Sequence, residues 1–191
     1  GQTLRSTSGI RNVALGSLVM ENNSIGSENV AVGTFSLSGN ITGSSNTVVG
    51  YNSNVLTSGL SNASAFGSGA IVDASNKVRI GSTSVFSIGG QVSWTTFSDG
   101  RYKQNIQQDV PGIAFINKLQ PVSYTVDINS LNHKYYKIKK DAATGFSNTE
   151  RQTGFIAQDV EKAAQELNYS FSGIDKPGSE NGLYGLRYAE F

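Results

Sequence analysis

The first half of the chain repeats itself at a constant step, and this period restricts its possible folds more than any other feature. Asn12-Val13-Ala14-Leu15-Gly16 recurs, with substitutions, at 29–33, 46–50 and 63–67, so the closing glycine returns at every seventeenth position. Each unit places a short apolar alternation before a glycine and a turn rich in Ser, Asn and Gly, which is typical of brief β-strands joined by tight turns. Such a coil cannot bury its apolar stripe alone, but stacked coils can. The repeat therefore predicts a stacked β-roll or β-helix.

A second series of glycines keeps the same period. Gly9, Gly26 and Gly43 are evenly spaced at the same step, the fourth member slips by one to Gly59, and a later echo of the motif at 76–81 breaks the period. Glycines at fixed points supply positive φ or close backbone approach at the corners of each coil. A flexible low-complexity linker would need no such period, so it is the weaker interpretation.

The composition changes abruptly at Ser98. Residues 1–97 carry four basic side chains, three acidic ones and 14 of the 22 glycines, whereas 98–191 carry eleven side chains of each charge. We therefore divide the chain into a repetitive β segment, 1–97, and a small charged globular domain, 98–191. The first segment is too polar and glycine-rich to fold around an ordinary core, so we expect it to borrow surface from partner chains.

Composition also excludes several classes of function. The net charge of +1 gives no argument for a nucleic-acid partner, and the chain has no run of 18 apolar residues that would span a membrane. With no cysteine and one histidine, His133, we expect no metal and no cofactor. Paired carboxylates that would indicate a glycan-processing enzyme are lacking. No leader sequence opens the chain, so we expect a piece of a longer protein.

The second half should contain helices and strands. The patterns predict helices over 111–119 and 155–167, strands over 122–126, 134–140 and 183–188, and a strand-like segment over 81–97. Trp94, in that last segment, reads better as a packing residue than as a ligand-stacking one. His133 reads as an exposed residue of a basic strand. The lysines of that strand suit an edge strand better than a polyanion or glycan patch.

The Asn-Val-Ala-Leu-Gly and Asn-Val-Ala-Val-Gly units, over roughly 9–81, resemble the head repeats of trimeric autotransporter adhesins. Those repeats form left-handed β-rolls packed three together, and similar ones occur in phage tail-fibre shafts. The resemblance implies a homotrimer, which would supply the missing core.

Four motifs in the second half carry a further resemblance. They are Ser98–Ile106, Leu119–Tyr124, Gly154–Val160 and Tyr184–Tyr188, in that order. They resemble the intramolecular chaperone domain at the end of endosialidase tail spikes and other phage tail fibres. The resemblance implies a small α+β domain that trimerises, helps the preceding fibre to fold and is then removed by autoproteolysis. That family usually continues beyond its last motif into a long helix, and we expect that C-terminal helix to be missing from residues 98–191.

The same resemblance assigns the chemistry. Carried onto this sequence, Ser98 is the nucleophile, Lys103 is the base, and the scissile bond joins Phe97 to Ser98, in cis or between protomers. Only about one in two thousand ordinary lysine amines is neutral at pH 7, and burial lowers an amine pKa by up to about 3–5 units. We therefore expect Lys103 to be desolvated only in the trimer, which predicts a cleavage rate whose pH midpoint lies well below 10.

The five-residue spacing of Ser98 and Lys103 does not by itself bring the two side chains together. Residues five apart lie about 140° apart on a helix and on opposite faces of a strand, so a turn must fold Lys103 back towards Ser98. Gly100 is the expected place for that turn, and Asp99 and Arg101 are expected to hold it or to pair across subunits. The alternative is a helix that begins with Ser98 as its N-cap, although a capping box would favour Glu or Gln at position 101.

Two functions remain open. The first is an intramolecular trimerisation chaperone that releases itself from a fibre or adhesin as a single-turnover serine–lysine endopeptidase. The second is a non-catalytic structural or adhesive trimeric fibre whose C-terminal half is a permanent cap. Either would be part of a phage virion tail fibre or a bacterial cell surface, with the fibre or shaft ahead of Ser98 as the partner.

Overall fold

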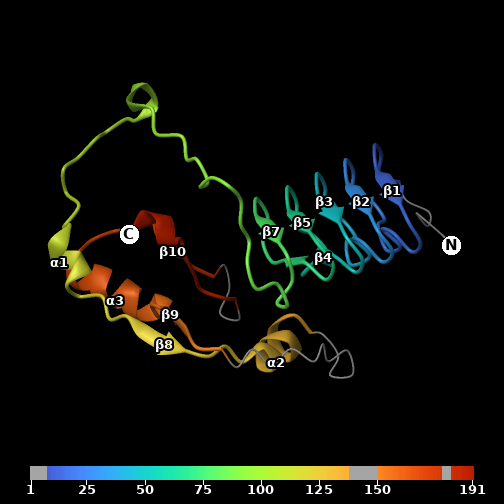
Figure 1. Ribbon diagram of the computed structural model, residues 1–191. Helices are drawn as coiled ribbons and strands as arrows, with labels where there is room; N and C mark the ends of the chain where they lie inside the picture. The colour runs from blue at the N-terminus through green and yellow to red at the C-terminus, as the bar shows by residue number, and fades with distance from the viewer. Residues whose placement is uncertain (1–7, 138–149, 178–181) are drawn as a thin grey trace. The chain divides into compact units, whose positions relative to one another are not determined.

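The computed structural model describes residues 8–137, 150–177 and 182–191. These residues divide into two compact units (Figure 1). The first unit contains 8–89 together with 128–137, and the second contains 90–127, 150–177 and 182–191. A short segment of the second half of the chain thus packs with the repetitive first half.

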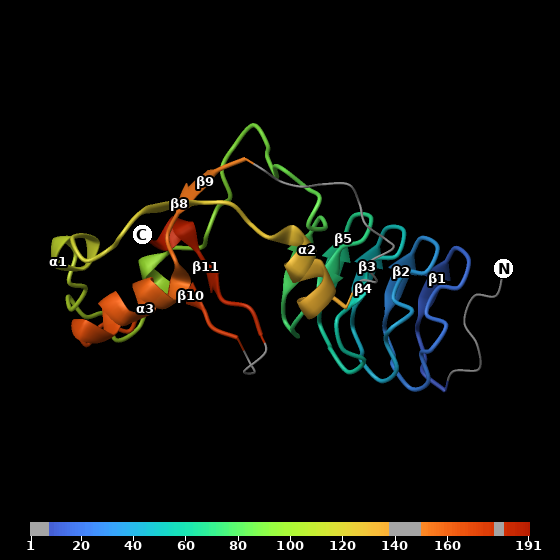
Figure 2. The same ribbon diagram turned by 90° about the horizontal axis from the view of Figure 1, so that it is seen from below.

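The first unit is a parallel β-solenoid, which confirms the fold predicted from the repeat. One five-stranded sheet has the order β1-β2-β3-β5-β7 (Figure 1), with β1, β2, β3 and β5 also visible in Figure 2, and a second sheet pairs β4 with β6. Strand pairing advances by one repeat at a time, as in Val13 with Val30 and Val30 with Thr47. The strands are β1 (Val13–Leu15), β2 (Val30–Val32), β3 (Thr47–Val49), β4 (Asn54–Val55), β5 (Ser64–Phe66), β6 (Ile71–Val72) and β7 (Val78–Ile80).

The middle residue of each strand in the larger sheet points into the solenoid. In the first four of these strands it is a small apolar residue: Ala14, Ala31, Val48 and Ala65 are aligned by the strand register. Ala31, Val48 and Ala65 are fully buried in the core of the unit. The flanking residues point outwards, and the larger side chains of the same core, Met20 and Leu37, come from the turns between strands.

Buried asparagines connect successive coils inside the solenoid. The backbone N–H of Asn29 donates to Asn12 Oδ1, and that of Asn46 donates to Asn29 Oδ1, each at a distance of 3.0 Å. The Asn29 side chain also donates to the carbonyl of Gly43 over 3.0 Å. Such a ladder satisfies polar backbone groups that the stacked turns would otherwise bury without partners.

Replacing Asn29 by alanine is therefore expected to destabilise the solenoid by about 1–3 kcal/mol, because the buried N–H of Asn46 loses its partner, whereas the carbonyl of Gly43 still accepts from the Asn40 side chain. Chemical denaturation followed by circular dichroism measures this change. Asn22→Ala is the matched control, since Asn22 is exposed and its side chain donates to the Ser38 carbonyl at the surface. Equal effects of the two substitutions would contradict the ladder's importance.

The two glycine series lie at corners of the coils that favour glycine for different reasons. Gly16, Gly33, Gly50 and Gly67 have φ between 111° and 138°, a conformation that favours glycine. At Gly26 the backbone is ordinary, but a Cβ would overlap the carbonyl oxygen of Gly43 on the next coil. The last coil is shorter than the one before it, because Thr47 pairs with Ser64 but Ser64 pairs with Val78. The echo at 76–81 therefore continues the stack despite its broken period.

A short helical segment completes the first unit. It consists of α2 (Ile128–Ser130) followed directly by one π-helical turn, η2 (Leu131–Tyr135), and it packs on the last coil. The prediction of a strand beginning at Lys134 is thus wrong for 134–137, because helical backbone hydrogen bonds, such as that from Tyr136 N–H to the Leu131 carbonyl, form there instead. His133 is exposed, as expected, but lies on this helix. Residues 138–140 of the expected strand lie outside the described residues.

The second unit combines short helices with two antiparallel strand pairs. Sheets β8-β9 and β10-β11 each contain two strands. The elements are η1 (Gly100–Tyr102), α1 (Ile113–Ile116), β8 (Val122–Tyr124), β9 (Gln152–Gly154), α3 (Ala157–Glu166), β10 (Ile174–Asp175), β11 (Gly185–Leu186) and η4 (Tyr188–Glu190). Helices α1 and α3 and strands β8 and β11 fall within their predicted ranges.

The core of this unit joins α1 to α3. Phe115 from α1 and Val160, Ala163 and Ala164 from α3 are buried with Phe171. The Phe115 and Phe171 ring centroids are 4.9 Å apart. This core lies wholly within the second half of the chain.

Two of the sequence motifs meet at the edge of this core. The backbone N–H of Phe155 donates to the hydroxyl of Tyr188 over 3.1 Å, and a Cβ on Gly154 would overlap that hydroxyl. A side chain at position 154 would therefore displace the hydroxyl of Tyr188, which belongs to the last of the four motifs.

The segment 81–97 differs from its prediction, since no strand forms there. Among the residues that the structure describes, no strand lies alongside this segment to pair with its backbone. Trp94 is 84% exposed, and the prediction that it is a packing residue is wrong for the single chain. In the part of the chain that the structure describes, no helix combines the length and the apolar character needed to cross a lipid bilayer.

Candidate active site at Ser98 and Lys103

A single helical turn brings Lys103 back to Ser98. The turn is η1, in which the N–H of Tyr102 donates to the Asp99 carbonyl over 3.1 Å and the N–H of Lys103 donates to the Gly100 carbonyl over 3.3 Å. The N-cap of this turn is Asp99, whose carboxylate accepts from the N–H of Arg101 over 2.9 Å. The alternative of Ser98 as the N-cap of a helix is therefore wrong.

Asp99 and Arg101 hold the turn from its outer side. The guanidinium of Arg101 binds both carboxylate oxygens of Asp99, through Nε at 3.0 Å and 3.1 Å and through a terminal nitrogen at 2.6 Å. The hydrogen bond from Arg101 lowers the pKa of Asp99 below its ordinary value, and the same contact raises the pKa of Arg101 above its own. Both side chains thus stay ionised, and their ion pair holds the backbone between Ser98 and Lys103 in this turn.

The turn places the two candidate catalytic atoms in direct contact. Lys103 Nζ lies 2.8 Å from Ser98 Oγ, within hydrogen-bonding distance. A nucleophile and a base at this distance are the arrangement that serine–lysine chemistry requires. The scissile bond proposed from the sequence, between Phe97 and Ser98, directly precedes this pair.

The protonation state of the amine determines what this pair can do. An ammonium group only donates hydrogen bonds, whereas a base must first lose its own proton. Both Ser98 and Lys103 are exposed in the single chain, and Phe97 is fully exposed. The chain alone therefore supplies the contact but not the desolvation that favours a neutral amine.

Large apolar side chains surround this pair on both sides along the chain. They remain exposed from the segment before the pair to the start of α1: Ile88, Val92, Trp94, Phe97, Tyr102, Ile106, Val110 and Ile113. Exposed apolar residues in such a run usually mark an interaction site. Their burial by another chain would also remove water from the neighbouring amine.

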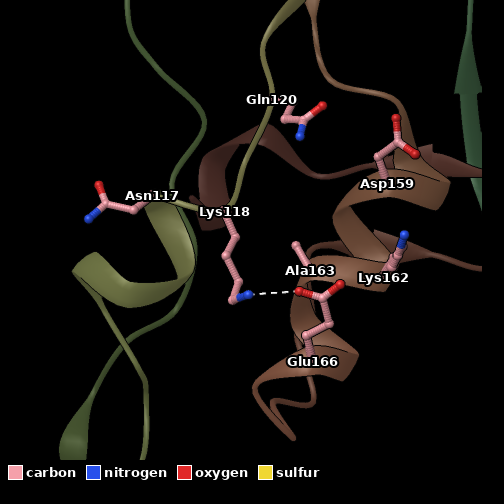
Figure 3. A pocket seen from close by; sticks show the side chains of 7 residues that line it. All are labelled: Asn117, Lys118, Gln120, Asp159, Lys162, Ala163 and Glu166. Atoms are coloured by element: carbon pink, nitrogen blue, oxygen red, sulfur yellow. Dashed lines mark hydrogen bonds and ion pairs between the residues drawn. The ribbon is translucent and has the colours of Figure 1, made fainter.

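No group of three or more histidine, cysteine or acidic side chains suited to a metal ion occurs among the described residues. The second unit does contain an open polar pocket of about 340 Å³ between the residues that follow α1 and helix α3 (Figure 3). Lys118 Nζ and Glu166 Oε2 form an ion pair of 2.7 Å across it, and this contact lowers the pKa of Glu166. Sequence reasoning did not find this pocket, and it contains none of the predicted site residues.

Sequence reasoning also missed a charged cluster at the end of the solenoid. The Asp73 carboxylate, with a side chain 6% exposed, pairs with Lys77 at 3.3 Å and with Arg79 at 3.5 Å. Burial alone would raise the pKa of Asp73, but Lys77 and Arg79 outweigh it and hold the pKa below the ordinary value. A signal was present, because these are three of only seven charged residues in 1–97.

No curated protein and no solved structure matches the chain. A family model does match residues 98–169, and that family, Peptidase_S74, is described as "Chaperone of endosialidase". The matched segment begins at Ser98 and contains Lys103, and it ends shortly after α3. The second half of this chain thus contains a segment similar to the endosialidase-type chaperone, a family whose name also marks it as a peptidase.

Proposed function

We propose that residues 98–191 form a small α+β intramolecular chaperone that assists the folding and trimerisation of the β-solenoid ahead of it. We further propose that this domain cuts the chain between Phe97 and Ser98. The observation that carries the proposal is the 2.8 Å contact between Lys103 Nζ and Ser98 Oγ, at the residue where the family match begins.

The reaction is a serine–lysine autoproteolysis with a single turnover. A neutral Lys103 accepts the proton of Ser98 Oγ as that oxygen attacks the carbonyl carbon of Phe97, in the same chain or in a neighbouring one. The C–N bond then breaks, and Lys103 passes the proton to the leaving amine. Water hydrolyses the resulting ester, which leaves a carboxylate on Phe97 and restores the serine hydroxyl.

Two apolar surfaces support a homotrimer as the active assembly. The register of the solenoid aligns a ladder of apolar side chains along the outer face of its larger sheet: Leu15, Val32, Val49, Phe66 and Ile80. The second surface is the exposed apolar run around Ser98. Packing of three chains over both surfaces would supply the solenoid with its missing core and desolvate Lys103, so the cut would report correct assembly.

A second function takes its support from the exposure of the candidate pair. If no assembly desolvates Lys103, the second half remains as a permanent cap on a structural or adhesive trimeric fibre. With either function, we place the protein in a phage tail fibre or on a bacterial surface, because both resemblances are to proteins of such fibres and adhesins. The shaft ahead of the cut is the partner that the chaperone serves.

Denaturing electrophoresis and intact mass test the cut directly. The chain is expected to yield two fragments, 1–97 and 98–191, and Ser98→Ala is expected to give a single chain of 191 residues. Ser123→Ala removes a hydroxyl of an exposed residue in the same unit, whose hydrogen bond is with Arg151, and it should leave the fragments unchanged. A full-length band from the parent protein, folded and at every pH tested, would contradict autoproteolysis and favour the permanent cap.

A further inference from the structure

At the last coil of the solenoid, a charged side chain takes the inward position. The inward position that holds alanine or valine in the four preceding strands of the larger sheet holds Arg79 in the last one, β7. Arg79 and Lys77 both pair with Asp73, whose carboxylate is nearly buried. An apolar end could be covered by any apolar surface, whereas this end favours a partner whose donor can add a hydrogen bond to the carboxylate that Lys77 and Arg79 already pair with.

The helical segment 128–137 provides that partner. The Tyr135 hydroxyl donates to Asp73 Oδ2 over 3.1 Å, and Thr83 Oγ1 donates to Asn132 Oδ1 over 2.8 Å. Tyr136 packs edge-to-face on Tyr135 with ring centroids 5.0 Å apart. Burial at this contact raises the pKa of Tyr136. Both figures place α2 beside the last coils of the solenoid (Figures 1 and 2).

The contact between this segment and the solenoid spans the proposed cleavage site. Asp73 and Thr83 precede the Phe97–Ser98 bond, whereas Asn132 and Tyr135 follow it. The hydrogen bonds between them therefore join the two products of a cut at that bond.

We propose that residues 128–137 are a non-covalent clasp that recognises the charged last coil of the solenoid and keeps the C-terminal fragment attached after the chain is cut. Separation of the fragments is then a second step, controlled by the bond between Tyr135 and Asp73 and not by peptide cleavage. The clasp itself is independent of the proposed function, and only its role after self-cleavage depends on it.

The test uses the full chain and a cut made by another enzyme. In a Ser98→Ala background, a recognition sequence for a site-specific protease is inserted after Gly90, where the neighbouring backbone is open. After complete digestion, the fragments are expected to co-elute in size-exclusion chromatography. Serial dilution, or a labelled C-terminal fragment in a competition assay, then measures the dissociation constant.

Removing one hydroxyl should weaken the clasp without unfolding it. Tyr135→Phe is expected to raise the dissociation constant about 10- to 100-fold, because it removes a hydrogen bond to a charged group that is screened from water. Tyr51→Phe, which removes an exposed hydroxyl elsewhere on the solenoid, should change nothing. In an Asp73→Ala background, which has no side-chain acceptor for that hydroxyl, Tyr135→Phe should add little further loss.

Two results would overturn the clasp. One is complete separation of the fragments of the digested parent. The other is an unchanged dissociation constant in Tyr135→Phe, which would mean that other contacts within an oligomer hold the fragments together. Circular dichroism of the undigested variants shows whether each one is folded. Failure of self-cleavage would appear separately, as an intact parent chain on a denaturing gel, and would leave this experiment unaffected.

Discussion

Lys103→Met is expected to slow the cut between Phe97 and Ser98 by about 100- to 10,000-fold, the usual contribution of a general base. The substitution keeps an unbranched side chain of similar length but removes the nitrogen that lies 2.8 Å from Ser98 Oγ. Without that nitrogen, no group within the η1 turn can take the serine proton, since Asp99 is engaged with Arg101 through both carboxylate oxygens. The rate is measured by quenching samples of freshly folded protein into denaturant and quantifying the fragments.

Two further variants separate the base from its charge. Lys103→Arg keeps a positive charge but stays protonated, so it should be as slow as Lys103→Met. Lys162→Met removes an exposed lysine of α3 in the same unit and should cleave at the parent rate. Rapid cleavage by Lys103→Met would show that Lys103 is not the base, even if Ser98→Ala abolished the reaction.

Gly26→Ala is expected to destabilise the solenoid by about 2–4 kcal/mol, near the upper end for overpacking by one methyl group. Gly26 has ordinary backbone angles, so the cost comes from space alone: its Cβ would overlap the carbonyl oxygen of Gly43, which belongs to the rigid backbone of the next coil. The two coils would have to separate locally, and the hydrogen bonds that join them would lengthen. Denaturant unfolding followed by circular dichroism gives the loss of free energy.

The matched control is Gly59→Ala. In the sequence Gly59 is the displaced fourth member of the same glycine series, but a Cβ there would meet only Thr42 Oγ1, at an ordinary contact distance of 3.4 Å. The structural equivalent of Gly26 and Gly43 in that coil is Leu60, whose carbonyl oxygen occupies the place that a Cβ on Gly43 would need. Gly59→Ala should therefore be nearly neutral or slightly stabilising. A large loss in Gly59→Ala, or none in Gly26→Ala, would show that the coils do not approach as closely as the structure indicates.

The solenoid was largely predictable because its rule is local and repeated. A constant period with apolar residues at alternate positions leaves few ways to bury them, and the register of Val13 with Val30 follows directly from it. The short last coil was harder to predict. Its strand β7 joins the sheet after a shorter connection than the earlier strands, because pairing requires a matching strand and not a constant loop length.

The members of the candidate site stay a prediction, and the geometry of their contact could not be predicted from the sequence. The order of motifs pointed to Ser98 and Lys103, yet their spacing fits neither a helix face nor a strand face. Contact depends on the η1 turn, which the Asp99 side chain caps. The prediction of a strand at 134–136 was wrong for a related reason. The tyrosines and lysines of this segment suit a strand, but its backbone forms helical hydrogen bonds and its side chains contact the end of the solenoid.

The amino-acid sequence by itself determined the stacked coils and the glycine corners, because each is encoded within one period, whereas the pair Ser98 and Lys103 stays a prediction that rests on the resemblance of four ordered motifs. Only the tertiary structure decided that Asn29 links its neighbouring coils, that Gly59 is not the equivalent of Gly26, and that Tyr135 contacts Asp73 from 62 residues away. These features depend on which atoms meet across coils and between distant segments, and a contact between distant residues leaves no periodic trace in a single sequence.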